Sequence, residues 1–348
     1  MGNSIRKERV LVTGGTGFLG IHCILQLLEK GFIVKTTVRR PEGKKDILAM
    51  LRTGGLEEPE NLDFFIADLG SDEGWEEAVS GCDYVLHVAS PFPTVMPRDE
   101  NELILPAREG TLRVLRLARQ GGIRRVVITS SFAAIGYGQD KTDRTFTESD
   151  WTNPEVPGIS AYVKSKTLAE KAAWDFMAEN GNNPELAVVN PVAILGPVLG
   201  PKLSSSIQIV KQLLEGRVTA APKIYFSVVD VRDVADLLIR AMTHTEASGQ
   251  RFLAVTGPSL SLIEVAGILR KNMGEAAKKA PTRELPNWIV RLSAPFMPQV
   301  RAFIPELGKP KNASNDKSRS LLGWKPGTRE DAILSSAESL IHLNLLAT

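Results

Sequence analysis

A short apolar strand that runs into three evenly spaced glycines constrains this chain more than any other feature. Residues 10–12 read Val-Leu-Val, which is typical of a strand buried on both faces. Gly14, Gly17 and Gly20 follow, and residues 21–28 then show helical periodicity. Glycines here would let the chain turn, let a diphosphate approach the backbone and let the helix pack on the sheet. Because a helix N-terminus favours phosphate, the segment predicts a dinucleotide-binding loop; a glycine-rich turn without a ligand is the alternative.

The tip of the next predicted strand carries arginine instead of an acid. Residues 32–38 read as a strand, and Arg39 and Arg40 follow it. In dinucleotide-binding folds an acid at this tip binds the ribose 2′-hydroxyl, whereas arginine accommodates a 2′-phosphate. Arg39 is the better candidate because it directly follows the strand, and a guanidinium binds phosphate bidentately. With Lys44 and Lys45 close behind, the pattern favours NADP over NAD; a solvated charged turn is the alternative.

Four further apolar segments, separated by helical stretches, complete a predicted sheet. They cover residues 62–67, 83–90, 125–131 and 186–192. Strands that alternate with helices at this rhythm predict an α/β fold with a doubly wound parallel sheet of the Rossmann type. Ligands bind such a sheet at the carboxyl ends of its strands.

The predicted strand ends carry further candidate contacts. Asp68 could accept a hydrogen bond from an adenine amino group, or only cap the next helix. Ala89 and Ser90 are small and would leave room for a cofactor across the strand ends. His87 lies inside an apolar strand and is therefore predicted to be a core histidine, not an acid or base.

Composition argues against several other classes of protein. The net charge of +2 gives no reason to expect nucleic acid or an anionic membrane as a partner. Cys23 and Cys82 are the only cysteines, and both lie in apolar runs, so neither a disulfide framework nor a metal site is expected. A polar N-terminus and the lack of a membrane-length apolar run predict a soluble, cytoplasmic protein.

Beyond Pro191 the composition changes. Prolines and a run of serines precede a helical segment, a short strand follows near residue 228, and the chain is mostly helical from residue 259. We therefore expect a smaller C-terminal lobe interleaved with the first domain. The predicted division is a dinucleotide-binding domain of residues 1–192 and 226–258, and a substrate-binding lobe of residues 193–225 and 259–348.

Tyr162 and Lys166 are four residues apart in a predicted helix and so share one of its faces, whereas Lys164 lies off it. A phenol is a poor acid at neutral pH, but a nearby ammonium would lower its pKa. Lys166 could also reach the ribose hydroxyls of a nicotinamide nucleotide. Ser131, at a strand end, could polarise a carbonyl oxygen. This set predicts hydride transfer to a carbonyl, with Tyr162 supplying the proton.

The order of these motifs resembles the extended short-chain dehydrogenases/reductases over nearly the whole chain. Within that superfamily it is similar to the dihydroflavonol 4-reductase-like group, which includes cinnamoyl-CoA reductases and microbial aldehyde or ketone reductases. The segments that carry the likeness are TGGTGFLG from Thr13, Thr37–Arg39, Ala67–Leu69, His87–Pro91, Thr129–Ser131, Tyr162–Lys166, Asn190–Pro191, Phe226–Ala235 and Leu321–Pro326.

The resemblance implies roles for individual residues. Ser131, Tyr162 and Lys166 would be catalytic, and Phe92 would join Ser131 and Tyr162 at the substrate. Plant dihydroflavonol reductases carry a polar residue where this chain has Gly136, which favours a smaller or less hydroxylated aldehyde or ketone. Motifs and resemblance together predict contacts to NADP (NADPH) from Thr13, Gly14, Gly17, Phe18, Leu19, Gly20, Arg39, Lys45, Asp68, Leu69, Val88, Ala89, Ser90, Tyr162, Lys166, Pro191, Val192 and Ser206.

Three functions stay open at this point. The first is NADPH-dependent reduction of a small-molecule aldehyde or ketone to an alcohol, reversible as an alcohol dehydrogenase, by a monomer or homodimer. The second is a sugar-nucleotide epimerase or dehydratase that retains NAD, against which Arg39 argues. The third is a non-catalytic dinucleotide sensor; such proteins commonly lose the tyrosine or the lysine, and both are present here.

Overall fold

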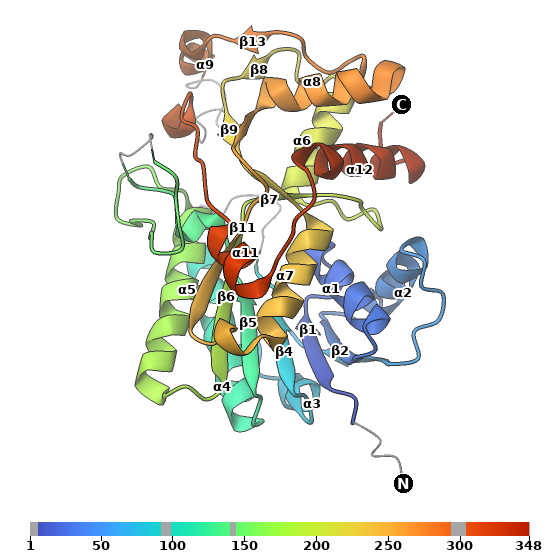
Figure 1. Cartoon of the computed structure of the whole chain (residues 1–348), viewed down its shortest axis with the longest axis vertical. Helices are drawn as coiled ribbons and strands as arrows, with labels where there is room; N and C mark the ends of the chain where they lie inside the picture. The colour runs from blue at the N-terminus through green and yellow to red at the C-terminus, as the bar shows by residue number, and fades with distance from the viewer. Residues whose placement is uncertain (1–5, 92–98, 140–143, 294–303, 348) are drawn as a thin grey trace.

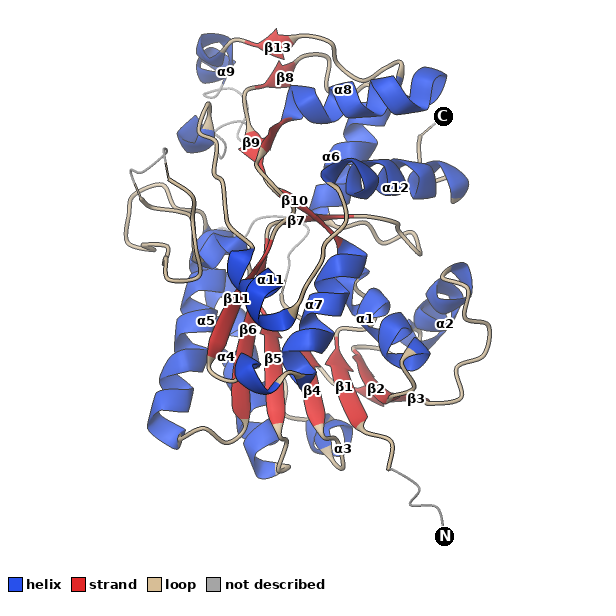
Figure 2. Cartoon of the chain, viewed as in Figure 1, coloured by secondary structure: helices blue, strands red, loops and turns tan. Residues whose placement is uncertain are grey.

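Seven parallel strands form the central sheet of the computed structural model, which describes residues 6–91, 99–139, 144–293 and 304–347. The strand order is β11-β6-β5-β4-β1-β2-β3, and the strand arrows in Figure 2 run side by side. This is the predicted doubly wound sheet, whose order reverses between β1 and β4, where such folds bind ligands. The bounds are β1 Arg9–Thr13, β2 Ile33–Val38, β3 Leu62–Ile66, β4 Tyr84–His87, β5 Arg125–Thr129, β6 Glu185–Pro191 and β11 Gln250–Ala254.

Successive residues of β1 enter different cores, as the Val-Leu-Val pattern predicts. Val10 and Val12 pack on one face of the sheet, and Leu11 packs on the other. Side chains alternate across a strand, so a strand covered on both faces must be apolar at every position. All three side chains are fully buried.

Helices cover both faces of the sheet (Figure 1). One face packs against α1, α2, α7 and the C-terminal α11, and the other against α3, α4 and α5. Leu322 and Trp324 are buried in the first of these cores, so the chain returns from the lobe to the sheet domain after residue 315. The bounds are α1 Phe18–Glu29, α2 Gly43–Thr53, α3 Trp75–Val79, α4 Asn101–Gln120, α5 Ala161–Asn180, α7 Val231–Thr243 and α11 Asp316–Leu322.

A second group of elements has its own core and lies beyond the carboxyl ends of the sheet strands (Figure 1). Its strands pair two by two, β7 with β10, β9 with β12 and β8 with β13. The strand bounds are β7 Ala193–Leu195, β8 Ala221–Pro222, β9 Tyr225–Phe226, β10 Val228–Asp230, β12 Leu260–Ser261 and β13 Glu284–Leu285. The helix bounds are α6 Ser205–Leu214, α8 Leu262–Met273, α9 Asn287–Ser293 and α12 Arg329–His342.

In the described part of the chain, every helix is too short or too polar to cross a membrane. The same residues hold no group of three or more His, Cys, Asp or Glu side chains placed to bind a metal ion. Cys23 and Cys82 are free and buried, as their apolar surroundings predict.

Candidate active site

The loop between β1 and α1 is tight and open at the helix end. Gly14 has a φ of +76°, which favours glycine. A Cβ on Gly20 would lie 2.3 Å from the carbonyl oxygen of Gly14, so the close approach of helix and loop requires glycine there. No side chain caps α1 after Gly17, and its first turn has no acid. The free N–H groups at this end can therefore receive a phosphate.

Thr13 joins the exits of β1 and β4. Its Oγ1 accepts hydrogen bonds from the backbone N–H groups of Val88, at 3.1 Å, and Ala89, at 3.0 Å. It also lies 2.9 Å from His87 Nδ1. Because both N–H groups donate, the hydroxyl donates to Nδ1, which leaves the histidine proton on Nε2. Thr13 is fully buried, and its side chain orients the ends of the two strands.

His87 is buried, as expected of a core histidine. Burial lowers its pKa to about 3, and the charge of Lys166 adds to the effect. The ring is therefore neutral at physiological pH. A neutral, buried ring that is hydrogen-bonded to Thr13 stabilises the end of β4, as expected of a core histidine.

The predicted nucleotide contacts lie around the ends of β2 and β3. Arg39 follows β2, is exposed, and has no ion pair or hydrogen bond to another described residue. Lys45 is exposed in the first turn of α2. Asp68 accepts a hydrogen bond from the backbone N–H of Gly70 at 2.7 Å through Oδ1. It does not cap the next helix, because the residue before α3 is Gly74. Leu69, half-buried, covers Gly110 of α4.

Ser131 and Tyr162 meet where β5 ends and α5 begins. Ser160 caps α5 by accepting a hydrogen bond from the N–H of Val163, so Tyr162 lies in the first turn. A hydrogen bond from the Ser131 hydroxyl reaches the Tyr162 phenol. Lys166 follows one turn along the same helix face. Of the three residues predicted to be catalytic, Ser131 and Tyr162 are thus in contact and Lys166 lies one helical turn away.

The pKa values at this cluster differ from the sequence expectation in one respect. Burial raises the pKa of Tyr162, and the hydrogen bond from Ser131 opposes that effect. The sequence predicted that Lys166 would lower the pKa of Tyr162. That prediction is wrong for this structure, because desolvation of the phenolate is the larger effect. Burial also lowers the pKa of Lys166 to about 8, against the charge of Glu170, which raises it.

Glu170 is a residue that the sequence argument missed. It is 1 % exposed and accepts hydrogen bonds from Ser130, from Asn190 Nδ2 at 2.7 Å, and from Arg251 Nε at 2.6 Å. Trp174 Nε1 lies 3.4 Å from its Oε1. The available signal was spacing: Glu170 follows Lys166 by the same four residues that separate Lys166 from Tyr162.

Charged groups of the lobe contact Tyr137, which lies between β5 and α5 and near Tyr162. Lys311 Nζ lies 3.5 Å from the centre of the Tyr137 ring and pairs with Glu306. Burial and the nearby Glu306 and Tyr162 raise the pKa of Tyr137. Gly136 is buried, and a Cβ on it would lie 2.3 Å from the Phe132 ring, so this position does not present a side chain to substrate.

The remaining predicted residues occupy varied places. Lys164 turns away to an ion pair with Glu100 at 2.8 Å, as its position off the helix face predicts. Ser206 lies in the first turn of α6 and donates to the carbonyl oxygen of Ile194. Phe92 is outside the described residues. Those in the first turn of α1 are Phe18 and Leu19, and those at or just after strand ends are Val88, Ala89, Ser90, Pro191 and Val192.

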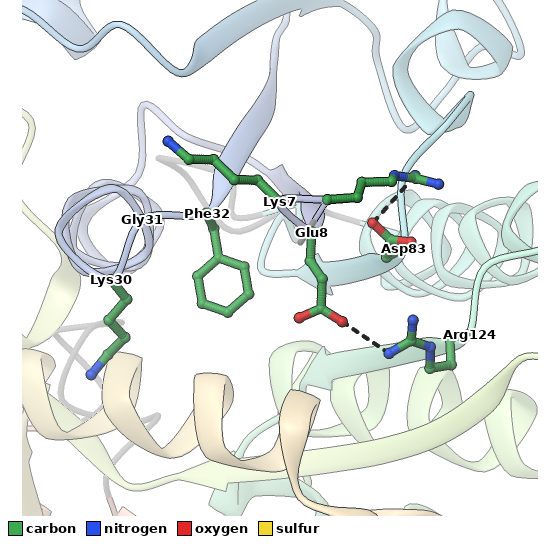
Figure 3. A pocket seen from close by; sticks show the side chains of 8 residues that line it. Lys7, Glu8, Lys30, Gly31, Phe32, Asp83 and Arg124 are labelled. Atoms are coloured by element: carbon green, nitrogen blue, oxygen red, sulfur yellow. Dashed lines mark hydrogen bonds and ion pairs between the residues drawn. The ribbon is translucent and has the colours of Figure 1, made fainter. Parts of the chain in front are cut away.

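Two described pockets lie at opposite edges of the sheet. A cavity of about 20 Å³, the size of a single water molecule, lies behind Lys166 and is bounded also by His87, Ser130 and Glu170. A pocket of about 500 Å³ opens at the amino ends of the strands (Figure 3) and contains none of the predicted site residues. It is lined by Arg6, Lys7, Glu8, Lys30, Gly31, Phe32, Asp83 and Arg124.

Known proteins match this chain along most of its length. A cinnamoyl-CoA reductase, CAD2, of Medicago truncatula is 38% identical over 276 residues, 78% of this chain and 82% of the relative. A putative NADPH-dependent methylglyoxal reductase, GRP2, of Candida albicans is 32% identical over 339 residues, 91% and 93% of the two chains.

Solved structures and a family match agree with this likeness. Gre2 of Candida albicans in complex with NADPH superposes with a TM-score of 0.79 and 28% identity, covering 97% of this chain and 99% of that one. Residues 10–254 match the NAD dependent epimerase/dehydratase family. The chain therefore belongs to that family, the extended short-chain dehydrogenases/reductases.

Proposed function

We propose that the protein is an NADPH-dependent reductase that converts a small aldehyde or ketone to an alcohol. The observation that carries the proposal is the cluster of Ser131, Tyr162 and Lys166 at the carboxyl edge of the sheet. The relatives support the coarser statement that the chain is an oxidoreductase, since the curated proteins compared above are named as reductases. The alternative within the family is a sugar-nucleotide epimerase or dehydratase, which retains NAD and does not consume NADPH.

The residues present fit an NADP nucleotide. The open N-terminus of α1 and the glycine contacts at Gly14 and Gly20 leave backbone N–H groups for the diphosphate. Arg39 stands exposed at the end of β2, without an internal partner among the described residues, where a 2′-phosphate is recognised. GRP2 is described as NADPH-dependent, and the Gre2 structure is a complex with NADPH. The cofactor is therefore NADPH.

Each member of the cluster has a distinct task. The bound nicotinamide supplies the hydride. Tyr162 donates a proton to the carbonyl oxygen, and its raised pKa keeps the phenol protonated for that step. Ser131 can hydrogen-bond the same oxygen, and Lys166 carries the positive charge that holds ribose hydroxyls. Tyr137 and the Lys311–Glu306 pair line the lobe side and orient the remainder of the substrate.

A panel of carbonyl compounds tests this function. Purified protein is mixed with NADPH and with aldehydes, ketones, diketones and flavanonols, and the loss of the reduced-nicotinamide absorbance is followed. We expect consumption of NADPH with small carbonyls and little with flavanonols. Tightly retained NAD, together with no consumption of NADPH on any carbonyl, would instead identify an epimerase or dehydratase.

A further inference from the structure

Glu170 links four elements that surround the candidate active site. From α5 its carboxylate binds Ser130 after β5, Asn190 of β6 and Arg251 of β11. Asn190 Nδ2 also donates to the backbone carbonyl oxygen of Ser131 at 3.2 Å. Through Asn190, Glu170 therefore fixes the backbone of a residue that contacts the Tyr162 phenol.

Arg251 is the cation that permits this carboxylate to be buried. The ion pair spans 2.6 Å, and the two side chains are 8% and 0% exposed. Arg251 also donates to the carbonyl oxygens of Glu148, at 2.7 Å, and Asp150, at 2.9 Å. Its guanidinium stacks 3.8 Å from the centre of the Trp151 ring. A buried charge pair of this kind is tolerated only with such additional hydrogen bonds.

Lys166 has one acid facing it among the described residues. It and Glu170 bound the same small cavity. On the β4 side His87 is neutral, β5 presents the hydroxyls of Thr129 and Ser130, and α4 presents Ala107 and Thr111. Tyr162 lies one turn earlier on α5, and Arg251 lies on the other side of Glu170.

We propose that Glu170 is a positioning residue for the nucleotide site, where its buried carboxylate supplies the counter-charge of the Lys166 ammonium and anchors the strand ends beneath Ser131. The role rests on the proposed function, because it acts through Lys166. Burial alone lowers the pKa of Lys166, and the charge of Glu170 limits that fall, so the lysine titrates at about 8. Above that pH the ammonium is lost.

The test is the charge-removing substitution Glu170→Gln. It deletes the carboxylate charge and keeps the shape of the side chain. Because Glu170 raises the pKa of Lys166, its loss lowers that pKa. We expect the alkaline fall of NADPH affinity, measured by fluorescence titration, to move to lower pH by about one unit. The alkaline limb of carbonyl reduction should move with it, and both should recover on acidification.

A matched variant separates this effect from a loss of stability. Glu185 pairs with the buried Arg125 at the amino ends of β5 and β6. Glu185→Gln breaks an ion pair in the same sheet but far from Lys166, so it should lower the melting temperature and leave both pH limbs in place. If Glu170→Gln fails to fold because Arg251 is left unpaired, Glu170→Gln with Arg251→Met removes both charges and should show the same shift.

The outcomes separate the two proposals. A folded Glu170 variant whose pH limbs coincide with those of the parent, or whose defect persists at low pH, overturns the role of Glu170. If the parent protein reduces no carbonyl, the proposed function fails. In that case a shifted limb of NADPH affinity still supports the role of Glu170.

Discussion

The two edges of the sheet use charged residues in opposite ways. At the amino edge Arg6 pairs with Asp83 at 3.5 Å and Arg124 with Glu8 at 3.0 Å, and both arginine side chains are more than half exposed. Figure 3 shows the pair of Glu8 and Arg124 beside the open pocket, whose volume is about 500 Å³. At the carboxyl edge Glu170 is buried beside a cavity of about 20 Å³.

The two edges differ in how far water reaches their charged groups. Water solvates the charges of the amino edge, so each group there gains little from its partner. At the carboxyl edge desolvation shifts the pKa values of Lys166 and Tyr162. Buried groups with displaced pKa values and specific partners are typical of functional sites.

The largest effect is expected from Tyr162→Phe. If Tyr162 donates the proton, reduction should fall on the order of 10²-fold or more, while NADPH affinity is kept. The matched control is Tyr84→Phe, since Tyr84 is a buried tyrosine at the amino edge that contacts Glu8 and Arg124. Steady-state rates should fall only for the first variant. Near-normal turnover of Tyr162→Phe would remove it from the mechanism.

A smaller but selective effect is expected from Arg39→Asp. Loss of charge-assisted hydrogen bonds to a 2′-phosphate should raise the Michaelis constant for NADPH roughly 10- to 100-fold. The constant for NADH should change far less. Arg40→Asp places the same charge at the next exposed position and should have a weaker effect. Equal changes for both nucleotides would defeat the assignment of Arg39.

Gly20→Ala tests the tight loop. The added Cβ would lie 2.3 Å from a backbone oxygen, which cannot move away as a flexible side chain can. We expect a loss of about 1 kcal/mol or somewhat more in the free energy of unfolding, with weaker NADPH binding. In α8, Gly267→Ala meets no atom within 4 Å and should stabilise the protein slightly. Denaturant unfolding compares the two.

The smallest effect is expected at the amino edge. Arg124→Gln breaks the exposed pair with Glu8. We expect a change in the free energy of unfolding within about 1 kcal/mol and an unchanged rate of reduction. A large loss of turnover in this variant would show that the amino edge takes part in function, and would contradict the contrast between the two edges.

Much of the fold followed from local patterns. Alternating burial in β1, the glycine loop and the rhythm of strands and helices predicted the parallel sheet, which the structure and the family match confirm. Boundaries were less accurate. The strand expected over residues 83–90 is β4 and ends at His87, after which the N–H groups of Val88 and Ala89 donate to Thr13 Oγ1. The helical return of Asp316–Leu322 to the sheet domain had no local signal.

The sequence by itself determined which residues share a strand face or a helix face, because backbone geometry sets those spacings. It therefore placed Tyr162 and Lys166 together on α5 and the three glycines at the turn from β1 into α1. Only the tertiary structure decided the partners of Glu170, which lie 20, 40 and 81 residues away in Asn190, Ser130 and Arg251. Strand order in the sheet brings those residues together, and spacing along the chain does not encode that order. Desolvation follows from the same packing, so the displaced pKa values of Tyr162 and Lys166 belong to the fold and not to the motif.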